Sequence, residues 1–197
     1  MRVVASTGRP WLAWLMLLVW SAWLAVGQAW IGLRAGFAPD LGLVLLLGCA
    51  GRFDPRDLPR CALCVALGRA AFSVEPAVGL LAGYLSIALA LRALRIVLEL
   101  TGGLQRALLA LPLAVANGCW LELVHRARDG ELIAALGQVE TFAGFASTGL
   151  ATAVAAALAS PLLLYLPGLT PLRRQGTRPL GRRALRRIGR GEGRVAF

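Results

Sequence analysis

The sequence predicts an all-α, polytopic transmembrane helix bundle of about six spans, two of them short or weak. A basic tail follows the bundle. Three observations lead to this prediction. Hydrophobic residues make up 58% of the 197 residues and charged residues only 16%, whereas about a quarter of a typical soluble domain is charged. Long stretches carry no charge. The 21 basic residues, all of them arginine, lie mostly between or after those stretches. A chain this apolar has little surface suited to water, and the bilayer removes that problem.

The first uncharged stretch, Pro10 to Leu33, predicts the first span, because about 20 apolar residues suffice to cross the hydrocarbon. Trp11 and Trp30 lie near its two ends, where indole rings favour the headgroup boundary. The stretch is longer than the apolar core of a signal peptide, and no clean small-residue cleavage site follows it. We therefore interpret it as a retained span.

The second and third stretches, Leu41 to Gly51 and Cys61 to Val74, are short, and Arg69 interrupts the third. They predict either two short tilted spans or a re-entrant pair. The fourth stretch, Pro76 to Leu91, ends beside two arginines that can snorkel to phosphates. The fifth stretch, Ala107 to Leu121, predicts a similar span.

The sixth stretch, Thr141 to Leu172, is too long for one span, and Pro161 and Pro167 are expected to kink or end its helix. It holds small residues at four-residue spacing, Ala151, Ala155 and Ala159, which permit close helix approach. Packing inside the bundle and contact with a partner are equally compatible with them.

Arginines in the short loops indicate the orientation, because cytoplasmic loops carry an excess of them. If the chain has six spans and a cytoplasmic N-terminus, three arginines lie on the outer side of the membrane: Arg34, Arg126 and Arg128. The inner side takes the remainder apart from Arg69: Arg2, Arg9, Arg52, Arg56, Arg60, Arg92, Arg95, Arg106 and the nine arginines from Arg173 to Arg194. We expect a multi-pass membrane protein with both termini in the cytoplasm.

We divide the chain into a transmembrane helical domain, residues 1–172, and a disordered arginine-rich cytoplasmic tail, residues 173–197. The tail has three interpretations: a topology anchor, attachment to anionic lipid, and contact with nucleic acid or an acidic partner. No aromatic residue interleaves the arginines to stack on bases, so we expect membrane lipids and no nucleic acid. The candidate lipid contacts are Arg173, Arg174, Arg182, Arg183, Arg186 and Arg187.

Arg69 is the most informative single residue, because an arginine inside a span is costly and usually faces the bundle interior or water. It is either a functional group that grips an anionic substrate or a partner's carboxylate, or a side chain that snorkels to the interface. Glu75, six residues on, is too far along the chain for a simple helical pair.

Other polar and sulfur-bearing residues give no site for catalysis, a cofactor or a metal. Cys61 and Cys64 form a CxxC pair without further ligands, and we interpret them as buried membrane thiols. Glu122 and His125 belong to a predicted mixed-charge outer loop, and catalysis would require them to converge on a cleft. We expect no enzymatic activity and no cofactor.

Pro39 and Asp40 follow the first span and open the short apolar stretch LGLVLLLGCAG. A polar turn, Arg52 to Arg60, leads to the glycine-containing span CALCVALGRAAFSVEPAVGLLAGYL, in which Gly68 precedes Arg69. This order of features, from about Trp11 to Leu166, resembles MreD, the rod-shape-determining membrane protein family of bacteria. That family often has an acidic residue a few positions after the glycine, whereas this chain has Arg69 directly after it.

The resemblance implies a non-enzymatic, inner-membrane scaffold of the cell-shape and lateral cell-wall elongation machinery, with Pro39, Asp40, Gly68 and Arg69 as structural or partner candidates. Its implied partners are an MreC-like protein, a transpeptidase and a glycosyltransferase. The MreD fold resembles the substrate-binding subunit of energy-coupling-factor vitamin transporters, which supplies the alternative function. That alternative requires a pocket with convergent polar groups, for which Arg69, Asn117 and Glu122 are the candidates.

Overall fold

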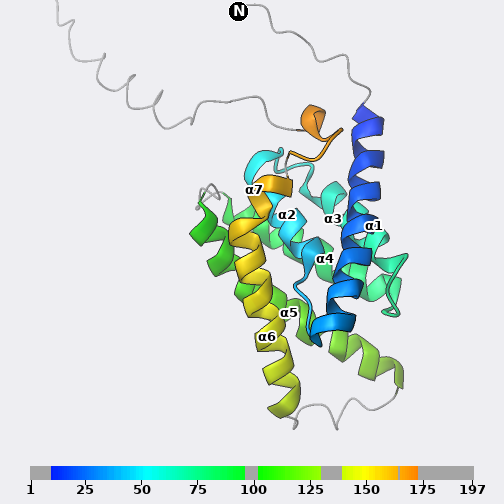
Figure 1. Cartoon of the computed structure of the whole chain (residues 1–197). Helices are drawn as coiled ribbons and strands as arrows, with labels where there is room; N and C mark the ends of the chain where they lie inside the picture. Colours follow the sequence, from blue (N-terminus) through cyan, green and yellow to red (C-terminus); the bar gives the residue numbers. More distant parts are fainter. Residues whose placement is uncertain (1–9, 96–101, 130–138, 164, 173–197) are drawn as a thin grey trace, which may run out of the picture.

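The computed structural model describes residues 10–95, 102–129, 139–163 and 165–172. Every regular element in these ranges is a helix, which confirms the all-α class (Figure 1). The elements in chain order are α1 (Pro10–Ala35), α2 (Leu41–Arg52), α3 (Leu58–Ala70), α4 (Ala77–Leu94), α5 (Gly103–Asp129), α6 (Val139–Leu158), α7 (Ser160–Leu163) and the 3₁₀ helix η2 (Thr170–Leu172).

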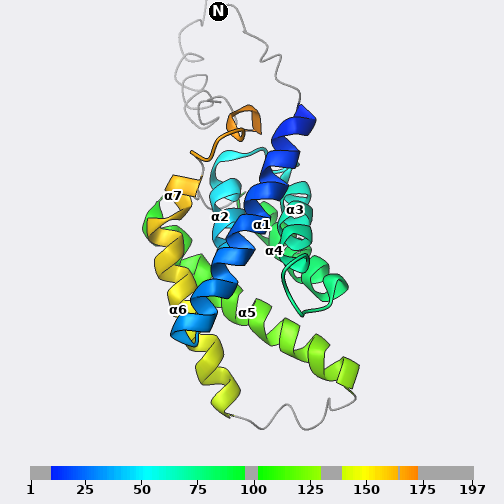
Figure 2. The ribbon, with the colours of Figure 1, turned by 45° about the vertical axis from the view of Figure 1, so that its right-hand side comes forward.

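The first predicted span is a single long helix, α1, and it runs along one side of the bundle (Figures 1 and 2). Trp11 and Trp30, near its ends, are exposed, as expected of rings at the two membrane boundaries. Trp20 instead faces the bundle, where its indole N–H donates to the carbonyl oxygen of Pro167 at 3.1 Å. The start of α1 and the end of η2 lie at the same end of the bundle (Figure 1).

The short second stretch forms the centre of the bundle rather than its edge. Helix α2 contacts α1, α3, α4, α5, α6 and α7, and all nine residues from Gly42 to Ala50 are buried. A helix that is apolar on every side can only be stable when other helices or lipid surround it. This explains why the stretch carries no polar face.

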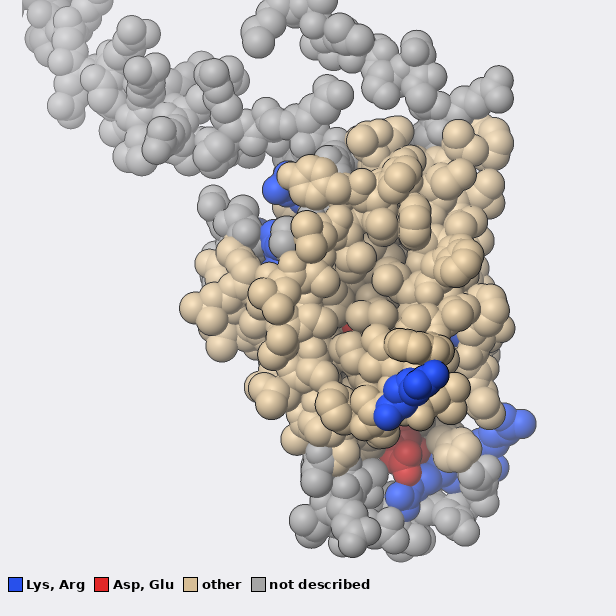
Figure 3. Space-filling view, in the orientation of Figure 1, with Lys and Arg blue, Asp and Glu red and all other residues tan. Residues whose placement is uncertain are grey.

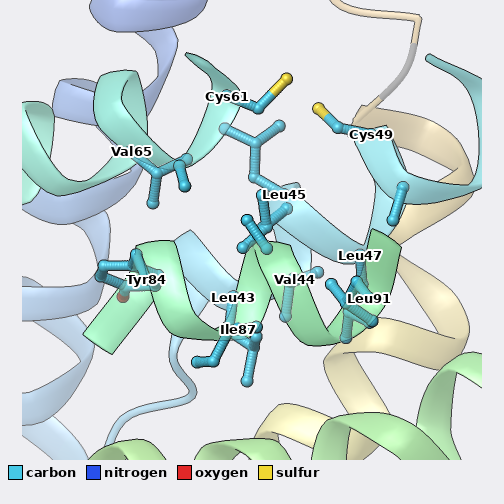
Figure 4. Close-up of a cluster of buried hydrophobic side chains, with 14 of the residues drawn as sticks. Leu43, Val44, Leu45, Leu47, Cys49, Cys61, Val65, Tyr84, Ile87 and Leu91 are labelled. Carbon is cyan, nitrogen blue, oxygen red and sulfur yellow. The ribbon is translucent and has the colours of Figure 1, made fainter. Parts of the chain in front are cut away.

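Helices α3 and α4 pack against α2 and contribute apolar side chains to its surroundings (Figure 4). Leu43, Leu47 and Ile87 belong to this cluster of buried side chains. The thiols of Cys49 and Cys61 point toward each other in the same view. All four cysteines are free, and Cys64 is half-buried.

Helices α5 and α6 pack side by side along much of their length. The prediction of a charged outer loop after Leu121 is wrong, because α5 continues to Asp129. Glu122 and Arg126 form an ion pair one turn apart on this helix, which favours its continuation. Helix α6 ends at Leu158, and Pro161 lies in the separate short helix α7, as the proline positions predict.

Three helices are long and apolar enough to cross a membrane, Trp11–Ala35, Ala77–Leu94 and Gly103–Arg128, while Leu41–Arg52 and Gly144–Leu158 are shorter apolar helices. The middle of the face in Figure 3 is almost free of charged side chains, which gather toward the ends. The chain is thus all-helical in its described residues and has three helices that, by length and composition, could span a membrane. The six tail arginines from Arg173 to Arg187 named as lipid contacts lie outside the described residues.

Gly68 sets how closely α3 approaches α1. A Cβ atom at this position would overlap the hydroxyl oxygen of Ser21 and lie 2.8 Å from the backbone nitrogen of Ala22. Ser21 has little room to move, because its hydroxyl donates toward the carbonyl oxygens of Leu18 (2.7 Å) and Cys64 (2.9 Å).

We predict that Gly68→Ala destabilises the protein by about 1–3 kcal/mol, the cost of overpacking a close contact. The measurement is the unfolding free energy, or melting temperature, of the detergent-solubilised protein. Gly144→Ala is the matched control, because Gly144 also lies in a helix but a Cβ atom added there would meet no atom within 4 Å. An equal or higher stability of Gly68→Ala would contradict the close α1–α3 packing.

Candidate functional site

The carboxylate of Asp40 is the centre of a buried polar cluster, which consists of Asp40, Arg69, Tyr84, Asn117 and Thr152. Its Oδ1 accepts from the backbone N–H of Leu43 at 3.0 Å, which caps the N-terminus of α2. The same oxygen accepts from the Tyr84 hydroxyl at 2.6 Å. Its Oδ2 accepts from Nδ2 of Asn117 at 3.1 Å and lies 3.0 Å from Nη1 of Arg69. Each oxygen therefore has two polar partners.

Arg69 faces the bundle interior, with only 14% of its side chain exposed. Its Nη1 contacts Asp40 and also donates to the Tyr84 hydroxyl oxygen at 2.7 Å, and its Nη2 lies 3.4 Å from Oε1 of Glu75. The interpretation of Arg69 as a side chain that snorkels to the interface is therefore wrong. The carboxylates it grips belong to its own chain.

Glu75 reaches Arg69 although the two residues are six positions apart. Helix α3 ends at Ala70, and the segment between α3 and α4 brings Glu75 back beside the end of the helix. Helical spacing therefore does not apply to this pair. The second oxygen, Oε2, is buried and has no hydrogen-bond partner.

Two polar residues that the sequence did not single out complete the buried polar cluster. The hydroxyl of Tyr84, which is fully buried, joins Asp40 to Arg69. The hydroxyl of Thr152 accepts the backbone N–H of Asp40 at 2.8 Å and donates to the carbonyl of Thr148. Each is a hydroxyl within an apolar helix, which is the one signal that could have identified them.

Two glycines make room for these contacts. A Cβ at Gly42 would lie 2.7 Å from the Tyr84 hydroxyl oxygen, and one at Gly83 would lie 2.6 Å from Oδ1 of Asn117. Side chains at either position would displace a member of the buried polar cluster. The cluster thus depends on backbone that passes within van der Waals distance of it.

A cavity of about 430 Å³ adjoins the buried polar cluster. Its polar wall includes Asp40, Arg69 and Asn117 of the cluster, together with Glu75 and Glu122. The other lining residues are Gln28, Ala38, Val74, Ala114, Gly118, Leu121, His125, Phe145 and Thr148. The volume is in the range of small-molecule sites, and the mixture of apolar and convergent polar groups is typical of them.

A second cavity, of about 390 Å³, shares Gln28, Ala38, Arg69, Val74 and Glu75 with the first. The ion pair between Arg69 and Glu75 therefore belongs to the wall that both cavities have in common. A molecule placed against this shared wall, in either cavity, would contact the pair.

The structure brings together most of the residues that the sequence indicated. Arg69, Asn117 and Glu122, the candidates for a substrate pocket, line one cavity. His125 lies on the same wall as Glu122, but Glu122 is engaged with Arg126. Pro39 immediately precedes the α2 cap, and Gly68 lies at the crossing of α3 with α1. Within the described ranges, no three or more His, Cys, Asp or Glu side chains are grouped so that they could hold a metal ion.

No protein-family model matches the chain, and neither a curated protein nor a solved structure matches it.

We predict that Asp40→Ala costs about 3–5 kcal/mol of stability, because it removes a helix cap and leaves the Arg69 guanidinium buried without its nearest carboxylate. Asp57→Ala is the control. It breaks an ion pair with Arg60, whose side chain is 71% exposed, and such pairs contribute less than about 1 kcal/mol. Chemical unfolding in detergent micelles measures both variants, and equal losses would argue against the buried polar cluster.

Proposed function

We propose that this protein is a non-enzymatic integral membrane component of the bacterial cell-shape and lateral cell-wall elongation complex. It acts as a scaffold, through contacts of its helices and short loops with other membrane proteins. The partners expected from the resemblance to MreD are an MreC-like protein, a transpeptidase and a glycosyltransferase. Its place is the inner membrane.

One observation carries the proposal: the residues on which the resemblance rests are neighbours in space. Asp40, from the Pro39–Asp40 pair, and Arg69, from the Gly68–Arg69 pair, are 3.0 Å apart. The family often has an acidic residue a few positions after the glycine, whereas this chain has a cation directly after it, and that cation contacts the acid of the other motif. The positive charge of Arg69, which departs from the family pattern, is therefore paired with the negative charge of Asp40 in the same chain.

The orientation we propose places both termini in the cytoplasm. The described ends of the chain lie at one end of the bundle (Figure 1). The α2–α3 turn contains Arg56 and follows α2 toward that end, Arg60 lies in the first turn of α3, and the arginine-rich tail begins beyond η2. Cytoplasmic loops of membrane proteins carry an excess of basic residues, so the arginine-rich side is assigned to the cytoplasm. The tail arginines would hold this side against anionic lipid, at about 1 kcal/mol for each arginine near the surface.

Affinity purification from native membranes tests the proposal. The tagged chain, extracted with mild detergents, is expected to recover cell-wall elongation proteins, identified by mass spectrometry, because a scaffold works through stable contacts. A polytopic protein of unrelated function with the same tag is the control. Recovery of the chain without any elongation protein in several detergents would count decisively against the proposed complex.

The cavity favours a second candidate function, that of a substrate-binding membrane subunit of a small-molecule transporter. The feature that favours this candidate is a 430 Å³ space lined by Arg69, Asn117 and Glu122. Such a subunit would use this space to bind its substrate within the membrane. This candidate requires a molecule that binds the purified chain saturably.

A further inference from the structure

From the charges around the cavity we infer that it binds a small organic cation, a protonated primary amine with an apolar body. The inference does not depend on a role in cell-wall elongation, and it gives a substrate class to the second candidate function. It rests on the state of Arg69, on an unpartnered carboxylate oxygen, and on the composition of the cavity wall.

Arg69 is committed to groups of its own chain. One terminal nitrogen contacts Asp40 and Tyr84, and the other lies beside Glu75. An anionic ligand would have to displace a carboxylate to reach this guanidinium. The cavity is therefore not built to recognise an anion, although an intramembrane arginine by itself suggests one.

The charges beside the cavity do not balance. With both carboxylates ionised, Asp40 and Glu75 carry two negative charges against the single positive charge of Arg69. Glu122, the other acidic group of the wall, is ion-paired with Arg126. His125 aside, the described residues that line the cavity leave one negative charge, and a ligand with one positive charge would neutralise it.

The excess charge has a specific acceptor atom. Oε2 of Glu75 is buried and accepts no hydrogen bond, whereas Oε1 is directed to Arg69, so a ligand in the cavity reaches Oε2 only when the carboxylate turns toward it. A carboxylate oxygen removed from water is costly unless a donor reaches it. An ammonium group supplies both the donor and the charge, and a charge-assisted bond of this kind is stronger than a neutral one.

The rest of the wall defines the body of the ligand. Phe145, Leu121, Ala114 and Val74 present apolar surface in the same cavity. A bare inorganic cation would leave this surface uncovered. The described residues also provide no group of three or more acidic, His or Cys side chains for a metal ion. An aromatic or aliphatic amine fits both parts of the wall.

Three probes with one aromatic body but different charges test this inference on the purified full-length protein in detergent. They are phenethylamine, which is a cation at pH 7, phenethyl alcohol, which is neutral, and 3-phenylpropionate, which is an anion. Saturable binding by calorimetry, with a rise in melting temperature, is expected for the amine alone. Equal binding of the alcohol or the acid, or no saturable binding of the amine, would overturn the inference.

Glu75→Gln is expected to weaken amine binding at least about tenfold, the loss that follows when a charge-assisted hydrogen bond becomes a neutral one. Asp57→Asn, which changes a carboxylate on the α2–α3 turn, should bind as the unmodified protein does. Unchanged affinity in Glu75→Gln would contradict the assigned acceptor. The three-probe comparison needs no variant and so decides the charge class even if Glu75→Gln does not fold. Binding is measured without partner proteins, so its outcome is independent of whether elongation proteins are recovered.

Discussion

The ion pair between Asp40 and Arg69 is the interaction on which the centre of this bundle depends. Burying two charges costs several kcal/mol each, and only close geometry with further hydrogen bonds offsets that cost. Here the Tyr84 hydroxyl bridges the pair, while Asn117 and the backbone of Leu43 use the remaining positions on the carboxylate. The pair therefore ties the start of α2 to α3, α4 and α5, and Thr152 adds α6 through the Asp40 backbone.

The same arrangement fixes α2, the short helix that contacts each of the α-helices from α1 to α7. Its sequence offers no polar face, so its depth in the bundle cannot be set by contact with water. The N-terminal cap supplies the missing anchor, because Asp40 can reach its three side-chain partners on other helices in only one position of α2 along its axis. The apolar packing shown in Figure 4 buries the side chains of α2, and the cap fixes the position of the helix along its axis.

The sequence is informative where a signal is local. The uncharged run from Pro10 predicts α1 almost to its last residue, and the prolines predict where α6 ends. Asp40 and Arg69 both stand out in the sequence, but 29 positions separate them along the chain, and nothing local indicates that they pair. Helical spacing argues against Glu75 as a partner of Arg69 only because the end of α3 is not visible in the sequence. The charged end of α5 resembles a loop, since charge density alone does not register the Glu122–Arg126 helical pair.

One cation between two carboxylates also explains how a structural pair and a ligand site can share residues. Asp40 holds Arg69 for the fold, and Arg69 holds Glu75 at the cavity wall, so the fold determines the charge that a ligand meets. A double-mutant cycle with Asp40→Ala, Arg69→Met and the double variant tests this most directly, by unfolding in detergent. The account predicts a coupling energy of at least about 1.5 kcal/mol, within the range for residues in one network. Additive losses, with coupling below about 0.5 kcal/mol, would contradict it.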